Sequence, residues 1–390
     1  MECQFNEYFK KIKALKKILI FIDWFEPGYK GGGPIRSIAG FVDNFNENFE
    51  LDIVTRDRDF NSEKTYDNIE TNIWCNDSKN VRLMFLSPEW TLSKIIKIFN
   101  KTEYDWVYLN SFFSVKYSIL PNLIFKFSKN YNGKVLLAPR GELNPERLNI
   151  KPIRKKVFIT LVKVFNLYNN VSWHCTSIVE KRNTLNLFSN SDVLLASNLS
   201  KKASVNINRA KETSSLKIIF ISRIINYKNL DYAIEVVNKM KSIDKVLFHF
   251  YGPIEDENYY HKCLDLAKKS KFDIIYKGEL KHFEVSRVFL SYDVFLFPTL
   301  GENYGHVIAE ALISGCAVIT SDQTPWGDLN LFDSGWAISL EDKEIFTEKL
   351  EELYKMSTEN FKLKKNSIYN YTKMKINNRD TISSYLDFLS

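Results

Sequence analysis

The stretch VFLFPTLGENYGHVIAEALISGCAVITS, from Val294 to Ser321, contains the pattern that decides the fold. Its leading apolar residues predict a short buried strand that ends at Phe297. A loop with two glycines follows, apolar residues at helical spacing begin near His306, and Ala317–Thr320 predicts another strand. A strand, a loop, a helix and a further strand in this order are typical of a doubly wound α/β domain with a parallel sheet.

The same alternation continues in both directions along the chain. Before this stretch, Leu216–Ser222 and Val246–Tyr251 predict strands, whereas Leu230–Met240 and Tyr259–Lys269 predict helices. Strands are also expected in the first half of the chain, at Ile18–Ile22, Leu51–Thr55, Val81–Leu86, Trp106–Leu109, Lys134–Ala138 and Ser172–Thr176. We therefore predict an α/β fold of two Rossmann-like, doubly wound domains that face each other across a cleft at the carboxyl ends of their strands.

The length of 390 residues suits two domains, and the polar stretch Ser197–Ser215 is the predicted linker. We expect an N-terminal domain over residues 1–200 on the acceptor side and a C-terminal domain over 201–370 on the donor side. A C-terminal helix within 371–390 is expected to pack back on the N-terminal domain.

The charge of the chain is unevenly distributed. Residues 1–200 hold 28 Lys and Arg against 21 Asp and Glu, whereas residues 201–390 hold 26 against 26. The whole excess of +7 therefore lies in the N-terminal half, which favours an anionic partner there. Five scattered cysteines without a CxxC pair argue against a disulfide framework and a zinc site, and no apolar run is long enough for a membrane span. We expect a cytoplasmic protein without a metal.

The loop and helix after Phe297 carry the strongest functional signal. A helix N-terminus presents free N–H groups and a partial positive charge, which suit a phosphate. Glu310, about two turns along the helix, can accept hydrogen bonds from both hydroxyls of a ribose, and Glu302 can orient a sugar hydroxyl. The donor-binding candidates here are Asn303, Tyr304, Gly305, His306 and Glu310, with Glu302 as a catalytic candidate. The alternative is that the two glutamates only cap and solvate a helix.

Arg223 and Lys228, which follow the predicted strand Leu216–Ser222, are the other catalytic candidates. Breaking the bond between a sugar and a diphosphate places negative charge on the departing phosphate. Two fixed cations stabilise that charge without a metal ion. The alternative is that both are solvated loop cations.

Two loops of the N-terminal half complete the candidate site. Consecutive glycines let the backbone approach a ligand closely, which makes Gly32 and Gly33 donor-binding candidates. In the stretch Ala138–Pro145, Arg140 can meet a phosphate or an acceptor oxyanion and Glu142 an acceptor hydroxyl. His174 is a third acceptor-binding candidate, with a satisfied core histidine as the alternative. Ser177 or Thr176 is expected to cap the following helix.

Several of these motifs resemble those of the family 4 retaining glycosyltransferases, which have the GT-B fold. Their pattern of P-S-x-x-E-x-F-G, E-A and G-x-P-V is similar to Pro298-Thr299, Glu302, Tyr304-Gly305, Glu310-Ala311 and Gly315–Val318 here. Phe220–Leu230 resembles their S-R-x-x-x-x-K-G pattern, and Ala138–Leu143 their P-R-G-x-L stretch. The departures are Tyr304 for Phe, Ala317 for Pro and Asn229 for Gly.

The resemblance implies a role for each candidate. Glu310 would hold the donor ribose, Glu302 would meet the transferred sugar, and Arg223 and Lys228 would bind the diphosphate. Gly278 and Leu280, in the stretch Lys277–Leu280, would meet the nucleotide base with main-chain atoms. Trp326 would either lie under the donor or belong to the core. The implied mechanism is attack on the same face as departure, with no side-chain nucleophile.

The implied function is transfer of a sugar from a nucleoside-diphosphate sugar, UDP rather than GDP, with no further cofactor. The implied acceptor is a saccharide or lipid-linked saccharide in O-antigen or capsular polysaccharide assembly. The segment Lys151–Phe165 mixes cations with apolar residues, so it is either a face for an anionic membrane at the inner side of the plasma membrane or a domain helix with Phe158, Leu161, Val162 and Phe165 in the core.

Other classes have weaker support. A nucleotide-sugar epimerase or dehydrogenase needs a G-x-G-x-x-G fingerprint with a later acidic residue, and Asp52 opens the next strand instead of closing it. No motif for nucleic-acid binding is present. A non-catalytic membrane-docking scaffold of the same fold remains the third alternative.

Overall fold

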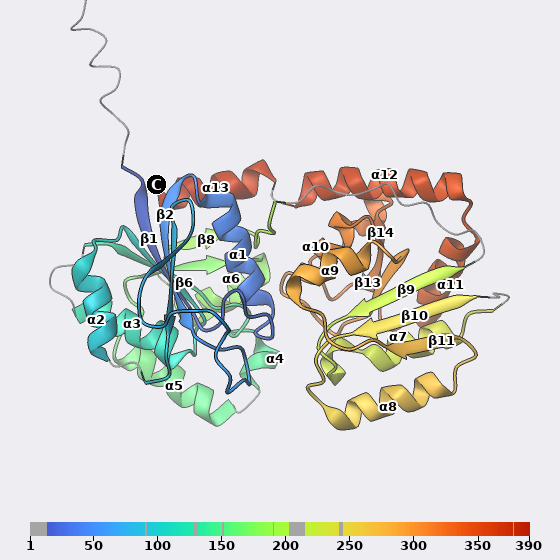
Figure 1. The fold of residues 1–390 in the computed structure, drawn as a ribbon, viewed down its shortest axis with the longest axis horizontal. Helices are drawn as coiled ribbons and strands as arrows, with labels where there is room; N and C mark the ends of the chain where they lie inside the picture. The colour runs from blue at the N-terminus through green and yellow to red at the C-terminus, as the bar shows by residue number, and fades with distance from the viewer. Residues whose placement is uncertain are drawn as a thin grey trace, which may run out of the picture. The chain divides into compact units, whose positions relative to one another are not determined.

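The computed structural model describes residues 14–89, 92–127, 132–149, 152–189, 191–202, 215–241, 245–376 and 378–390. The chain splits into two compact units, unit 1 with residues 1–196 and 383–390, and unit 2 with residues 197–382 (Figure 1). The division after Ala196 falls at the start of the predicted linker, of which residues 203–214 lie outside the described part.

Unit 1 is built on a sheet that has eight strands in its described residues, in the order β3-β4-β2-β1-β5-β6-β7-β8. The bounds are β1 Lys16–Ile22, β2 Phe49–Arg56, β3 Cys75–Ser78, β4 Val81–Leu86, β5 Trp106–Asn110, β6 Lys134–Ala138, β7 Val171–Cys175 and β8 Val193–Leu195. Strand β3 pairs with β4 antiparallel, and the other printed pairings are parallel. The sequence did not predict β3, which is polar, or β8, which has three residues.

Helices connect the parallel strands of unit 1. They are α1 Gly33–Phe45, α2 Leu92–Lys101, the π-helical turn η1 Val115–Ile119, α3 Leu120–Phe127, α4 Pro145–Leu148, α5 Pro152–Val164 and α6 Ile178–Leu187. Helix α1 buries Ile38, Phe41, Val42 and Phe45, which share one face because of the apolar spacing of residues 35–45. Ser177 caps α6, since its hydroxyl accepts a hydrogen bond from the Glu180 N–H at 3.1 Å.

Unit 2 has a parallel sheet of six described strands in the order β11-β10-β9-β12-β13-β14. The strands are β9 Leu216–Ile221, β10 Val246–Tyr251, β11 Asp273–Tyr276, β12 Val294–Phe297, β13 Ala317–Ser321 and β14 Gly335–Ile338. The helices are η2 Asn226–Lys228, α7 Leu230–Asn238, α8 Glu257–Lys268, α9 His282–Phe289, α10 His306–Ile313, η3 Leu329–Phe332, α11 Lys343–Lys355 and α12 Thr358–Lys375.

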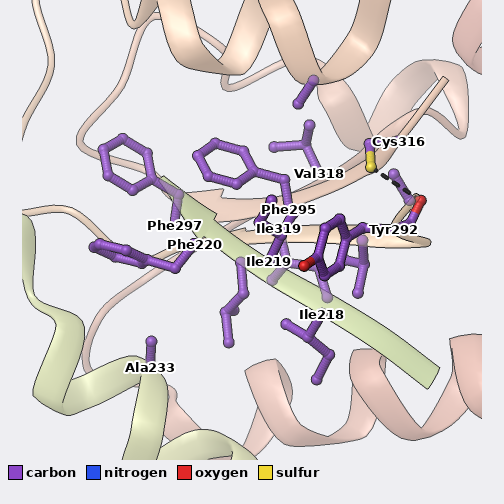
Figure 2. Close-up of a cluster of buried hydrophobic side chains, with 14 of the residues drawn as sticks. Ile218, Ile219, Phe220, Ala233, Tyr292, Phe295, Phe297, Cys316, Val318 and Ile319 are labelled. Atoms are coloured by element: carbon purple, nitrogen blue, oxygen red, sulfur yellow. Dashed lines mark hydrogen bonds between the residues drawn. The ribbon is translucent and has the colours of Figure 1, made fainter. Parts of the chain in front are cut away.

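The core of unit 2 lies around its central strands (Figure 2). Ile219 and Phe220 of β9, Phe295 and Phe297 of β12 and Ile319 of β13 have no exposed surface. The rings of Phe295 and Phe297 stack with centroids 5.1 Å apart. Large side chains packed at this density hold strands rigidly, so the loops that leave the strand ends start from fixed positions.

The strand order of each sheet identifies the point at its carboxyl end where a ligand is expected. In unit 2 the order reverses between β9 and β12, and in unit 1 between β1 and β5. At such a point the loops after the two strands run in opposite directions and leave a crevice at the carboxyl ends. The loops after β9 and β12 hold Arg223, Lys228 and Glu302, and the loop after β1 holds Gly32.

The C-terminal helix α13, Arg379–Leu389, belongs mainly to unit 1. The carbonyl oxygen of Leu389 accepts hydrogen bonds from Lys16 Nζ at 3.3 Å and Trp106 Nε1 at 3.1 Å. Tyr385 is buried against Phe41 and Phe45, with ring centroids 5.7 and 5.4 Å away. The structure thus divides the expected segment 371–390 between the end of α12 and α13.

Candidate active site

Three loops of unit 2 are tied together at the carboxyl edge of the sheet. The Ser222 N–H donates to the Tyr251 carbonyl oxygen at 3.1 Å, and the Gly252 N–H donates to the Gly278 carbonyl oxygen at 3.0 Å. Gly252 has φ +137°, and a Cβ there would lie 1.8 Å from the Ser222 carbonyl oxygen. Only glycine therefore permits this approach. Gly252 was not among the candidates from the sequence, although the predicted strand that ends at Tyr251 directly precedes it.

Lys228 and Glu302, two of the three catalytic candidates, form an ion pair between Nζ and Oε1. Only 11% of the Lys228 side chain and 18% of the Glu302 side chain are exposed. Lys228 lies at the end of η2, after β9, and Glu302 lies in the loop after β12. The pair therefore spans the point at which the strand order reverses.

Arg223, the third catalytic candidate, lies two residues after the end of β9, and its side chain is more exposed than that of Lys228. Its Nη1 lies 2.6 Å from Glu255 Oε2, and 37% and 36% of the two side chains are exposed. Solvent screening makes such a pair weak, so the guanidinium can change partners when an anion arrives.

Asn229 explains one departure from the family pattern. It has φ +62°, in the left-handed region that glycine adopts readily and that asparagine tolerates better than other residues. Its Nδ2 donates to the Pro298 carbonyl oxygen at 2.9 Å, which joins the start of α7 to the loop after β12. Asparagine therefore keeps the backbone conformation and adds a hydrogen bond that glycine cannot make.

The predicted helix after β12 is α10, and it begins at His306 as expected. Its N-cap, Gly305, has φ +79°, and a Cβ there would lie 3.0 Å from Ile308 Cδ1 and 3.3 Å from Trp326 Nε1. Trp326 Nε1 donates to the Tyr304 carbonyl oxygen at 2.5 Å, and Trp326 is 2% exposed. Trp326 is thus a core residue that fixes the loop in front of α10, whose first N–H groups lack intrahelical partners.

The other donor candidates lie around this helix start. Because α10 begins at His306, Glu310 stands about one turn inside the helix and not two turns along it, as was expected. The rings of Tyr304 and His306 lie 4.6 Å apart. Burial raises the pKa of Tyr304 to about 12, with a smaller contribution from the charge of Glu310. Asn303 precedes this pair, and Gly278 and Leu280 follow β11 at the same edge.

In unit 1, Gly32 and Gly33 lie where the loop after β1 meets α1. Gly32 is the N-cap of α1 with φ +76°, and Gly33 is the first helical residue. Asp59 holds this loop, since its carboxylate accepts hydrogen bonds from the N–H groups of Tyr29 at 2.9 Å and Lys30 at 3.1 Å. Asp59 was not a candidate, because no local pattern links it to a loop 30 residues earlier.

Arg140 follows β6 and has an unusual backbone, with φ +55°. Its Nε and Nη2 donate to Asn110 Oδ1 at 3.1 and 2.5 Å, and Nη2 also donates to the Tyr108 hydroxyl at 3.0 Å. Non-glycine residues with positive φ cost about 1–2 kcal/mol and persist where the surroundings hold them. The guanidinium of Arg140 is therefore held at the carboxyl edge of β5 and β6.

The two remaining acceptor candidates have internal partners. Glu142 accepts hydrogen bonds from the N–H groups of Phe112 and Phe113 at 2.6 and 3.1 Å, and burial raises its pKa. His174 is fully buried within β7 and hydrogen-bonded on both ring nitrogens. For His174 the core alternative is the correct one, because a fully buried ring cannot touch an acceptor.

The core interpretation of the segment around α5 holds for two of its four residues. Val162 is buried and Phe158 packs against the core of unit 1, but Leu161 and Phe165 are 47% and 64% exposed. Lys151 lies outside the described residues. A helix can bury only the face that meets the sheet, and residues 161 and 162 point about 100° apart.

None of the helices in the described part of the chain is both long and apolar enough to span a bilayer. The same residues contain no group of three or more His, Cys, Asp or Glu side chains suited to a metal ion.

The chain has the GT-B fold, which consists of two doubly wound α/β units. In each unit the candidate residues lie at the carboxyl ends of the parallel strands. The crystal structure of Anabaena HepE with UDP and glucose is similar over 96% of this chain and 98% of its own, with a TM-score of 0.67 and 11% identity. A mutant of Staphylococcus aureus TarM, in complex with fondaparinux, alpha-GlcNAc-glycerol and UDP, is similar over 96% and 100%, with a TM-score of 0.65 and 14% identity.

The sequence comparisons agree with this class. Residues 202–373 match the family described as glycosyl transferases, group 1. An uncharacterized 41.2 kDa protein in the cps region of Klebsiella pneumoniae is 22% identical over 369 residues, which are 92% of this chain and 96% of that protein. Together these matches support a glycosyltransferase of the GT-B fold.

Proposed function

We propose that this protein is a retaining, metal-independent glycosyltransferase that moves a sugar from a UDP-sugar to an acceptor hydroxyl. The observation that carries the proposal is the Lys228–Glu302 pair at the point of strand reversal, beside the N-terminus of α10. The family match over residues 202–373 and the UDP bound in HepE and TarM support the same donor class.

The chemistry assigns one task to each part of this edge. As the bond between sugar C1 and the diphosphate breaks, negative charge grows on the leaving phosphate. Lys228, Arg223 and the N–H groups at the start of α10 stabilise that charge. Glu302 orients the transferred sugar, and Glu310 binds the ribose. The departing phosphate takes the proton of the acceptor hydroxyl on the same face, so the anomeric configuration is retained.

Release of UDP tests the reaction. We expect the purified protein to release UDP from UDP-sugars in the presence of a lipid-linked saccharide, with full activity in EDTA and retained configuration in the product by NMR. Glu310→Gln weakens donor binding, whereas Glu348→Gln, an exposed residue of α11, has no effect. A protein that binds membranes but never releases a nucleoside diphosphate would instead be a non-catalytic scaffold.

The solvent face of α5 supports a lipid-linked acceptor at an anionic membrane. Ile153, Val157, Leu161 and Val164 are between 47% and 76% exposed and share one stripe by helical geometry. The exposed cations Arg154, Lys156 and Lys163 lie on the same helix, which contains no acidic residue. Each cation contributes about 1 kcal/mol at an anionic surface. The relative from a cps region favours capsular polysaccharide as the product.

Vesicle flotation tests this docking face. We expect binding to phosphatidylcholine vesicles that contain phosphatidylglycerol, weaker binding without it, and release at high salt. Val157→Ser together with Leu161→Ser reduces binding, whereas Ile73→Ser, at a residue of unit 1 that is 47% exposed outside this stripe, leaves it unchanged. Equal binding to both kinds of vesicle contradicts the electrostatic part of the proposal.

A further inference from the structure

A buried chain of hydrogen bonds connects Arg140 with the interior of unit 1. Arg140 Nη2 lies 3.0 Å from the Tyr108 hydroxyl, which lies 2.6 Å from His174 Nδ1. On the other side of the imidazole, His174 Nε2 lies 2.9 Å from the Ala196 carbonyl oxygen. Tyr108 and His174 are 2% and 0% exposed, so water does not compete for these bonds.

The direction of each bond follows from the chemistry of its partners. A carbonyl oxygen only accepts, so His174 Nε2 carries the hydrogen that is donated to Ala196. Burial, with the nearby charge of Arg140, lowers the pKa of His174 to about 3, so the ring is neutral and Nδ1 has a free lone pair. The Tyr108 hydroxyl must then donate to Nδ1, which leaves its oxygen lone pairs for the guanidinium of Arg140.

Other contacts fix the loop that carries Arg140. Glu180 accepts hydrogen bonds from the Gly141 N–H at 2.6 Å and the Thr176 N–H at 2.8 Å, which ties the loop after β6 to the loop after β7. Glu180 is 1% exposed. The Gly141 N–H beside Arg140 is therefore held by Glu180, whereas the guanidinium is held by Asn110 Oδ1 and by the Tyr108 hydroxyl.

The C-terminal helix touches the same imidazole. The Tyr385 hydroxyl lies 2.9 Å from His174 Nε2, on the side of the ring where the Ala196 carbonyl already receives the hydrogen. Tyr385 therefore contacts His174 without standing between His174 and Arg140. This gives two buried tyrosines on one histidine, of which one is in the path to Arg140 and the other is not.

We infer that Tyr108 and His174 are positioning residues, which hold the Arg140 guanidinium in place for a phosphate group of the substrate. The inference rests on the proposed function, because it needs a phosphate-bearing substrate at the carboxyl edge of unit 1. That phosphate belongs either to the UDP-sugar or to a lipid-linked acceptor. Loss of the Arg140 contact raises the KM for whichever of these two substrates carries the phosphate. Arg140 makes the contact, and the other two residues act through it.

A double-mutant cycle tests the coupling. We expect Arg140→Ala and Tyr108→Phe each to raise one KM about tenfold, with kcat changed less than about threefold, and the double variant to resemble Arg140→Ala alone. A raised KM for the UDP-sugar identifies the donor phosphate, and a raised KM for the lipid-linked saccharide identifies the acceptor phosphate. Tyr385→Phe, the matched control, leaves both constants within about twofold. Additive effects of Tyr108→Phe and Arg140→Ala overturn the inference.

Two further measurements keep the test decisive. If Tyr108→Phe does not fold, His174→Gln replaces it in the cycle with the same expected non-additivity. Nitrogen-15 NMR of the five histidines in the full chain reads the tautomer without any substrate. We expect His174 as the neutral Nε2–H form from about pH 5 to pH 8, and an Nδ1–H or charged ring overturns the relay. If the wild-type protein turns over no nucleotide sugar, both the proposed function and the substrate role of Arg140 are wrong. The NMR result still tests the hydrogen-bond chain from His174 through Tyr108 to Arg140.

Discussion

Lys228 and Glu302, which are 74 residues apart in the sequence, form an ion pair in which both side chains are more than four-fifths shielded from solvent. The carboxylate neutralises the cation that is proposed to bind the donor diphosphate. A diphosphate therefore has to compete with Glu302 for Lys228.

Removing this competition gives the first prediction. Glu302→Gln should bind UDP about fivefold more tightly, because Lys228 keeps its charge while a carboxylate that repels the diphosphate is gone. Turnover should fall at least about tenfold, since the sugar loses its proposed partner. Isothermal titration and UDP release measure the two effects. Glu255→Gln should change UDP binding less, because its pair with Arg223 is better solvated; weaker UDP binding by Glu302→Gln would contradict this view of the pair.

Arg223 should matter for binding and not for stability. Its ion pair with Glu255 is more than one-third exposed, and such pairs contribute at most about 1 kcal/mol. We expect Arg223→Ala to weaken UDP binding about tenfold and to leave the urea midpoint nearly unchanged. Lys239→Ala, which removes another exposed pair, with Glu344, should affect neither quantity. A large loss of stability in Arg223→Ala would show a structural role instead.

Two substitutions of Asn229 separate the energetic cost of its left-handed backbone from the contribution of its side-chain hydrogen bond. Asn229→Gly should cost about 1 kcal/mol, because only the bond to the Pro298 carbonyl is lost. Asn229→Ala should cost about 2 kcal/mol or more, because alanine also disfavours φ +62°. Urea unfolding measures both free energies. Equal costs for the two variants would mean that the left-handed backbone carries no strain.

Gly252 should tolerate no side chain. A Cβ at 1.8 Å from the Ser222 carbonyl oxygen forces the loops after β9 and β10 apart, and we expect Gly252→Ala to cost about 3 kcal/mol or more. Gly327→Ala is the matched control, because no atom lies within 4 Å of its added Cβ. Gly252→Ala should lower the melting temperature and weaken UDP binding, whereas Gly327→Ala should change neither. Similar behaviour of the two variants would contradict the close approach.

The burial of His174 predicts a pH dependence of stability. The pKa is about 3 in the folded state and near its ordinary value of 6.5 in the unfolded chain. Between these values the unfolded chain binds a proton that the folded protein excludes, so falling pH favours unfolding by up to about 1.4 kcal/mol per pH unit. The contribution is complete above pH 6.5. Urea unfolding from about pH 7.5 to pH 5 should show a shallower dependence for His174→Gln; equal slopes would place a charged His174 in the folded protein.

The sequence predicted what depends on neighbouring residues. The inward face of α1 follows from apolar spacing, and the start of α10 follows from the strand, the glycine loop and the apolar run in the stretch 294–321. These signals lie within about 20 residues, where chain geometry alone determines which side chains share a face.

The remaining features depend on contacts between distant segments. Gly252 is needed because two loops 30 residues apart approach each other, and no pattern around residue 252 contains that information. His174 has partners 66 and 211 residues away, so its burial was one alternative among two. For α5 the core positions Phe158 and Val162 were correct and Leu161 and Phe165 were not, because apolar spacing alone does not identify how much of a helix meets the sheet.

Residues 383–390 complete the packing of unit 1. Tyr385 is buried in it, and the Leu389 carbonyl oxygen accepts hydrogen bonds from Lys16 and Trp106. During synthesis on the ribosome, all of unit 2 is therefore made before unit 1 has its full set of packing partners. A nascent chain halted before α13 lacks the packing of Tyr385 against Phe41 and Phe45.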